Sequence, residues 1–83
     1  MMDNKKYIDK VIVHLVKGTK IDNNNNLTSL PFFVPQYFLP AFTPSYPSYF
    51  FSSYCKNTFG LTEDEIKYVW KEYKDNMLEK IHQ

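Results

Sequence analysis

Hydrophobic residues recur with the period of an α-helix near the start of the chain. Between residues 4 and 17 one apolar stripe is formed by Ile8, Val11, Ile12, Leu15 and Val16. Asp3 or Asn4 is the expected N-cap, and Gly18 stands where a left-handed C-terminal cap belongs. A β-strand is the alternative, because residues 11–13 are β-branched, but the strict alternation of a strand is missing. The pattern therefore favours a helix over residues 4–17.

The last third of the chain predicts two helices that meet at Gly60. Aromatic residues recur at helical intervals over residues 48–59, and a longer helix over residues 62–81 follows. Thr62 and Glu65 have the spacing of a capping box, in which each side chain bonds the backbone N–H of the other residue. The longer helix has one apolar face, formed by Ile66, Val69, Trp70, Tyr73, Met77 and Ile81.

The middle of the chain joins a polar turn to an aromatic, proline-rich segment. Residues 19–32 predict a short β-hairpin around the asparagine run at 23–26, with a flexible polar loop as the alternative. Residues 30–55 contain five prolines, ten aromatic residues and no charged residue. We call residues 31–47 the strap, and expect an extended segment whose rings help to fill a small core. The sequence thus predicts one small domain over residues 1–83, of the α+β class and mostly α.

Composition limits the chemistry that this chain can support. Cys55 is the single cysteine, so an internal disulfide is excluded, and His14, His82 and Cys55 lack the spacing of a zinc site. Cys55 and His14 could be imagined as a nucleophile and its base, but no third group orients the pair, and we interpret Cys55 as a core residue. The acidic residues 63–65 are explained by a helix start. We expect no enzyme, no catalytic residue, no metal site and no cofactor.

The charged residues bear on partners and location. The net charge is +1, with ten lysines and no arginine, which argues against specific nucleic-acid recognition. Lys67, Lys71 and Lys74 share the exposed face of the last predicted helix, so weak nucleic-acid binding is one alternative function. The first ten residues carry charges where a secretory signal needs an apolar core. We therefore expect an intracellular, cytoplasmic protein.

The stretch YCKNTFGLTEDEIKYVWKEY, from Tyr54 to Tyr73, resembles a C-terminal pattern in small uncharacterised proteins of large, AT-rich DNA viruses. The preceding order of helix, polar hairpin and aromatic–proline segment is similar as well. The resemblance implies a viral source, in a host cell or virion. It implies no activity and no functional residues.

The number of aromatic rings leads to the functional hypothesis. A monomer rarely leaves so many rings uncovered, so we expect part of the strap to face a partner. The leading hypothesis is a non-enzymatic interaction or structural protein that self-associates, as a dimer, or binds another protein. The candidate interaction surface joins strap and last helix and consists of Phe38, Phe42, Tyr46, Tyr49, Trp70 and Tyr73.

A membrane offers an alternative partner for the strap. Aromatic residues favour the membrane–water interface, so the strap could anchor a peripheral membrane protein. A membrane-spanning helix is excluded, because the five prolines would leave backbone groups unpaired in lipid.

Overall fold

A computed structural model describes residues 4–24, 27–32 and 47–81 of the chain. Its elements are helix α1 (Lys5–Gly18), strands β1 (Lys20–Ile21) and β2 (Leu27–Ser29), and helices α2 (Tyr49–Phe59) and α3 (Glu63–Ile81). The predicted α+β class, mostly α, is confirmed, and the short hairpin is present as well.

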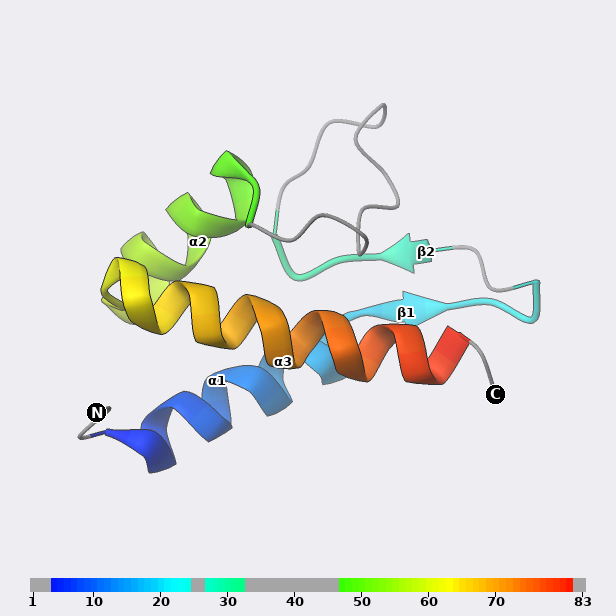
Figure 1. The fold of residues 1–83 in the computed structure, drawn as a ribbon. Coiled ribbons are helices and arrows are strands. Elements are labelled where there is room, and N and C mark those ends of the chain that lie inside the picture. The colour runs from blue at the N-terminus through cyan, green and yellow to red at the C-terminus, as the bar shows by residue number, and fades with distance from the viewer. Residues whose placement is uncertain (1–3, 25–26, 33–46, 82–83) are drawn as a thin grey trace.

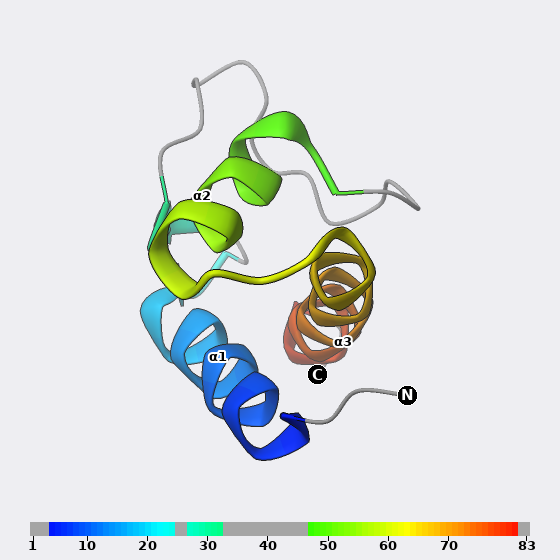
Figure 2. The same cartoon turned by 90° about the vertical axis from the view of Figure 1, so that its left-hand side faces the viewer.

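The three helices pack around a common centre, and α3 contacts both of the others (Figures 1 and 2). α1 lies along one side of α3. α2 leads through Gly60 into α3, so these two helices form a corner (Figure 2). The hairpin follows the end of α1 and projects from the helical part of the molecule (Figure 1).

Every helix contributes side chains to one apolar core. The buried residues are Ile8, Val11 and Leu15 of α1, Phe51 and Cys55 of α2, Leu61, and Ile66, Val69, Trp70, Tyr73 and Met77 of α3. They include most of the residues in the apolar stripes predicted for residues 4–17 and 62–81. In the stripe of α1, however, Ile12 and Val16 are only partly buried.

Local capping interactions set the corner between α2 and α3. Ser48 Oγ accepts a hydrogen bond from the Phe51 N–H at 3.3 Å and begins α2. Gly60 ends α2 with a left-handed backbone, at φ 68°. At the start of α3, Glu65 Oε1 lies 2.8 Å from the Thr62 nitrogen and Thr62 Oγ1 lies 3.2 Å from the Glu65 nitrogen. The structure thus contains the capping box that the sequence indicated.

The end of α1 differs from the sequence prediction. Gly18 is the last residue of the helix, and the C-cap is Thr19 with an extended backbone. Gly18 instead allows Pro31 to pack closely against the helix, because a Cβ at this position would lie 2.9 Å from the Pro31 Cβ. At the other end, the N-cap Asn4 makes no capping hydrogen bond with its side chain. The other predicted cap, Asp3, lies outside the described residues.

The hairpin is short and antiparallel. Lys20 lies opposite Ser29, and Ile21 lies opposite Leu27, with an irregularity between the two pairs. In the turn, Asp22 Oδ1 accepts a hydrogen bond from the Asn24 N–H at 2.9 Å. This contact is the local side-chain bond that favours turns in asparagine- and aspartate-rich segments.

Thr19 joins the hairpin to the core. Its Oγ1 donates a hydrogen bond to the Leu15 carbonyl at 2.8 Å and lies 2.6 Å from the Tyr73 hydroxyl oxygen. Because a hydroxyl has one proton, Tyr73 must be the donor in the second bond. Thr19 is buried, so both of its hydrogen bonds are shielded from water.

The first part of the strap packs against the core. The ring centroid of Phe32 lies 5.3 Å from that of Phe51 and 5.7 Å from that of Tyr54, in T-shaped and tilted arrangements. Pro31 lies against Gly18. The prediction of an extended strap over residues 31–47 otherwise concerns residues 33–46, which lie outside the described part of the chain.

We predict that Gly60→Ala lowers the free energy of unfolding by about 1 kcal/mol, because a left-handed backbone is strained for a residue with a Cβ. No atom lies within 4 Å of a Cβ built there, so the cost is conformational and not steric. Urea denaturation followed by circular dichroism measures it. Gly60→Asn should lose less stability, since asparagine tolerates this conformation. Equal losses for the two variants, or no loss for alanine, would contradict the assignment.

Candidate functional site

The six predicted surface residues fall into three groups. Phe38, Phe42 and Tyr46 lie outside the described residues. Tyr49 is 77% exposed and lies on the surface as predicted.

Trp70 and Tyr73 require a correction. Their exposed fractions are 4% and 0%, so neither ring belongs to an interaction surface. The reason is the direction of the apolar face of α3, which turns toward α1 and α2 and forms the centre of the core. The part of the predicted surface that the structure retains is therefore Tyr49.

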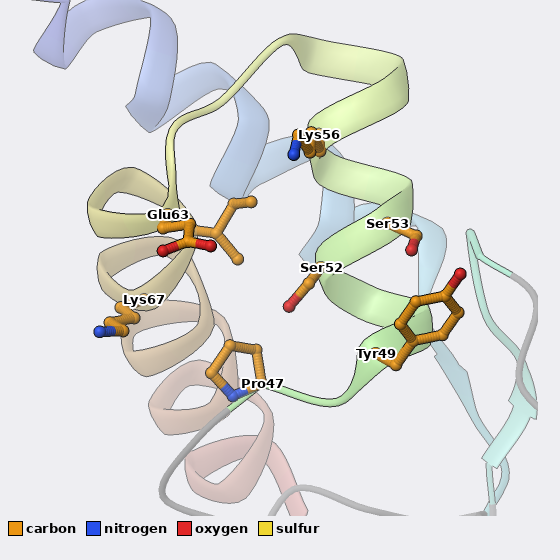
Figure 3. Close-up of a pocket in the computed structure, with 8 residues that line it drawn as sticks. Pro47, Tyr49, Ser52, Ser53, Lys56, Glu63 and Lys67 are labelled. Carbon is orange, nitrogen blue, oxygen red and sulfur yellow. The ribbon is translucent and has the colours of Figure 1, made fainter.

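Tyr49 borders a groove between α2 and α3, which we call the α2–α3 groove (Figure 3). Its volume is about 450 Å³. It is lined by Pro47, Tyr49, Ser52, Ser53, Lys56, Glu63, Ile66 and Lys67. Figure 3 shows Ser52 and Lys56 on α2, Glu63 and Lys67 on α3, and Pro47 between the two helices at one end.

The walls of the groove follow from helix periodicity. Tyr49, Ser52, Ser53 and Lys56 stand at positions i, i+3, i+4 and i+7 of α2 and therefore share one face. Glu63, Ile66 and Lys67 have the same relation in α3. The corner at Gly60 turns these two faces toward the same space. The buried Ile66 supplies an apolar base, while the hydroxyls and charges lie around it.

The groove carries more positive than negative charge. Lys56 and Lys67 are exposed, one on each wall, and Glu63 is the carboxylate among the lining residues. The ion pairs found in the described residues involve none of these three side chains. Both ammonium groups are thus available to an acidic ligand.

The buried thiol of Cys55 is chemically quiet. Burial raises its pKa to about 12, so the thiol keeps its proton at neutral pH and lacks the thiolate that a nucleophile needs. His14 lies on the surface, where its Nε2 is 3.4 Å from the Tyr54 hydroxyl and its ring packs edge-on against Phe59. The two residues thus occupy different environments.

The lysine face of α3 has mixed charge. Lys71 Nζ lies 3.6 Å from a carboxylate oxygen of Glu72 and 3.7 Å from one of Asp75. Lys67 instead lines the α2–α3 groove, and Lys74 is half-buried. Interleaved acids of this kind weaken attraction to a phosphate backbone.

Residues 4–24, 27–32 and 47–81 contain neither a cluster of metal ligands nor a helix suited to cross a membrane. Within these ranges no three His, Cys, Asp or Glu side chains gather in a way that could hold a metal ion. The helices of the same ranges lack the combined length and apolar character of a membrane span.

Comparison of the chain with protein-family models, with curated proteins and with solved structures finds no match.

The sequence contained a signal for the groove that its aromatic content obscured. The aromatic content points to Tyr49 alone, although the serines and Lys56 stand on the same face of α2. Their helical spacing after the Ser48 cap was readable. The opposing wall on α3 could not be assigned to the same site, because that requires the angle between the helices.

We predict that the protein loses stability as the pH rises above 9, toward 12. The unfolded Cys55 thiol releases its proton near its ordinary pKa of 9.0, whereas burial keeps the folded thiol protonated to about 12. The unfolded state then binds fewer protons, so the free energy of unfolding falls by up to about 1.4 kcal/mol per pH unit. Urea titrations at pH 8 and pH 10 measure this change. Cys55→Ala should show a smaller fall, and an equal fall in both proteins would contradict the prediction.

Proposed function

We propose that this protein is a non-enzymatic binding module that takes a short acidic segment of a partner protein into the α2–α3 groove. The segment carries an apolar side chain next to a carboxylate. The observation that carries the proposal is the exposed ring of Tyr49 at the edge of a groove with an apolar base.

Size and composition support a peptide ligand. A volume of about 450 Å³ falls within the roughly 300–1,000 Å³ range of ligand pockets. Tyrosine is enriched among the residues that dominate binding energy, because it offers a large rigid surface and a hydroxyl. Pro47 adds a second apolar surface at the end of the groove. An apolar side chain of the partner would contact these rings and Ile66.

Charge supports an acidic partner. Lys56 and Lys67 stand on opposite walls, and Ser52 and Ser53 are among the lining residues of the same groove. A carboxylate between the walls would gain charge-assisted hydrogen bonds, which are stronger than those between neutral groups. Glu63 would repel a second carboxylate of the partner segment. The proposed segment therefore carries few acidic residues.

The buried, protonated thiol of Cys55 supports the non-enzymatic part of the proposal. The same free thiol suits a reducing compartment, so an intracellular location belongs to the proposal. A viral source also remains a proposal, supported by the resemblance over residues 54–73.

The test is a selection of peptides from a random displayed library on the immobilised protein. We expect enriched peptides to combine an acidic residue with an aromatic or aliphatic one. Synthetic copies should bind in fluorescence anisotropy. We predict that Tyr49→Ser and Lys67→Glu each weaken binding about tenfold or more, because the first removes the large exposed ring and the second replaces an ammonium group with a carboxylate.

The matched control is Lys10→Glu, which reverses an exposed charge on α1 away from the groove. Its affinity for the same peptides should equal that of the parent protein. Circular dichroism should show all three variants folded, since the replaced side chains are exposed. Peptides that bind the Tyr49 and Lys67 variants as well as the parent, or a selection without enrichment, would refute the proposed function.

A further inference from the structure

The apolar stripe of α1 is wider than the surface that the core covers. Ile8, Val11 and Leu15 are buried, but Ile12 and Val16 beside them are only partly covered. Val13 is 50% exposed. Three branched aliphatic side chains therefore lie together at the edge of the core and in partial contact with water.

These side chains lie in a second groove, between α1 and α3. Its volume is about 360 Å³, and it is lined by Asp9, Ile12, Val13, Val16, Lys17, Glu72 and Asn76. We call it the α1–α3 groove. It shares no lining residue with the α2–α3 groove. The two surfaces can therefore be tested separately.

Opposite charges flank Val13 along α1. Asp9, Val13 and Lys17 stand at positions i, i+4 and i+8, so Val13 lies midway between the two charges. With a rise of 1.5 Å per residue, Asp9 and Lys17 are separated by about 12 Å along the helix axis. The α1 side of the groove is thus acidic at one end, aliphatic in the middle and basic at the other.

Such an arrangement is complementary to its own antiparallel copy. We propose that the α1–α3 groove binds a second copy of this chain, with the two α1 helices antiparallel about a two-fold axis near Val13. Asp9 then faces the partner's Lys17, and Lys17 faces the partner's Asp9. The two Val13 side chains meet at the axis, and a two-fold interface repeats every contact.

Other charges around the groove are compatible with this pairing. Lys5 Nζ lies 3.2 Å from the Asp9 carboxylate within the same helix. A carboxylate has two oxygens and about four acceptor sites, so it can accept the partner's Lys17 as well. Glu72 supplies a second acid to the groove, and a carboxylate oxygen of this residue lies 3.6 Å from Lys71 Nζ. No ion pair with Lys17 is found in the part of the chain that the structure describes.

The expected dimer is weak. A single helix face buries less than the roughly 800 Å² per partner of a standard interface. Exposed ion pairs add little affinity but determine the register and the choice of partner. Reversing one of these charges should therefore change which chains associate with each other.

The test is sedimentation velocity of the full chain at concentrations from about 10 µM to about 1 mM. The parent protein should shift from monomer toward dimer over this range. In a dimer of the Asp9→Lys variant, the introduced lysine would face the partner's Lys17 at both ends of the interface. In a dimer of the Lys17→Asp variant, the introduced aspartate would face the partner's Asp9 at both ends. Each single variant should remain monomeric at concentrations where the parent is a dimer.

An equimolar mixture of the two single variants supplies the decisive observation. In the mixed dimer, the lysine introduced by Asp9→Lys in one chain faces the aspartate introduced by Lys17→Asp in the other. The unchanged Lys17 of the first chain faces the unchanged Asp9 of the second. The mixture should dimerise although neither component does, a result that misfolding of a variant cannot produce.

The matched control is Lys67→Glu, which alters the other groove and should dimerise like the parent. A parent that is monomeric at about 1 mM, or a mixture that stays monomeric, overturns the proposal.

Discussion

The hydroxyl of Tyr73 donates a hydrogen bond to Thr19 Oγ1 at 2.6 Å in the interior of the protein, and this contact joins α3 to the end of α1. The Tyr73 ring stacks on Phe51 at a centroid distance of 5.7 Å and meets Phe32 edge-on at 6.3 Å. One side chain of α3 thus joins α2, the strap and the junction between α1 and the hairpin. Burial raises the pKa of Tyr73 to about 12, so this donor keeps its proton throughout the neutral range.

The inward direction of these rings explains why Trp70 and Tyr73 contribute almost nothing to the surface. A chain of this size has few means of stabilisation, and buried aromatic rings provide much apolar area per residue. Once Tyr73 and Trp70 fill the core, Tyr49 is left outside on α2. Val13 also lies outside the core, on α1, beside the partly buried Ile12.

Local signals made the helices predictable, and tertiary contacts account for what was missed. The Thr62–Glu65 capping box and the glycine turn at Gly60 act over a few residues, so spacing alone indicated them. The prediction of a left-handed cap at Gly18 is wrong because the role of this glycine depends on Pro31, a residue distant in sequence. The prediction that Tyr73 belongs to an interaction surface is wrong, and a tyrosine on an apolar face fits a core or an interface equally well. The hydroxyl of Thr19, which decides between them, belongs to another element. Neither groove could be predicted, since each requires the relative placement of two helices.

A double-mutant cycle on Thr19 and Tyr73 tests the central claim most directly. Thr19→Val and Tyr73→Phe each remove one side of the buried hydrogen bond with little change in shape, and urea denaturation gives the free energy of unfolding of each variant. If the bond joins α3 to the end of α1, the double variant should lose less stability than the sum of the single losses, with a coupling energy of about 1 kcal/mol. Strictly additive losses would show that the two hydroxyls act independently, and would contradict the account.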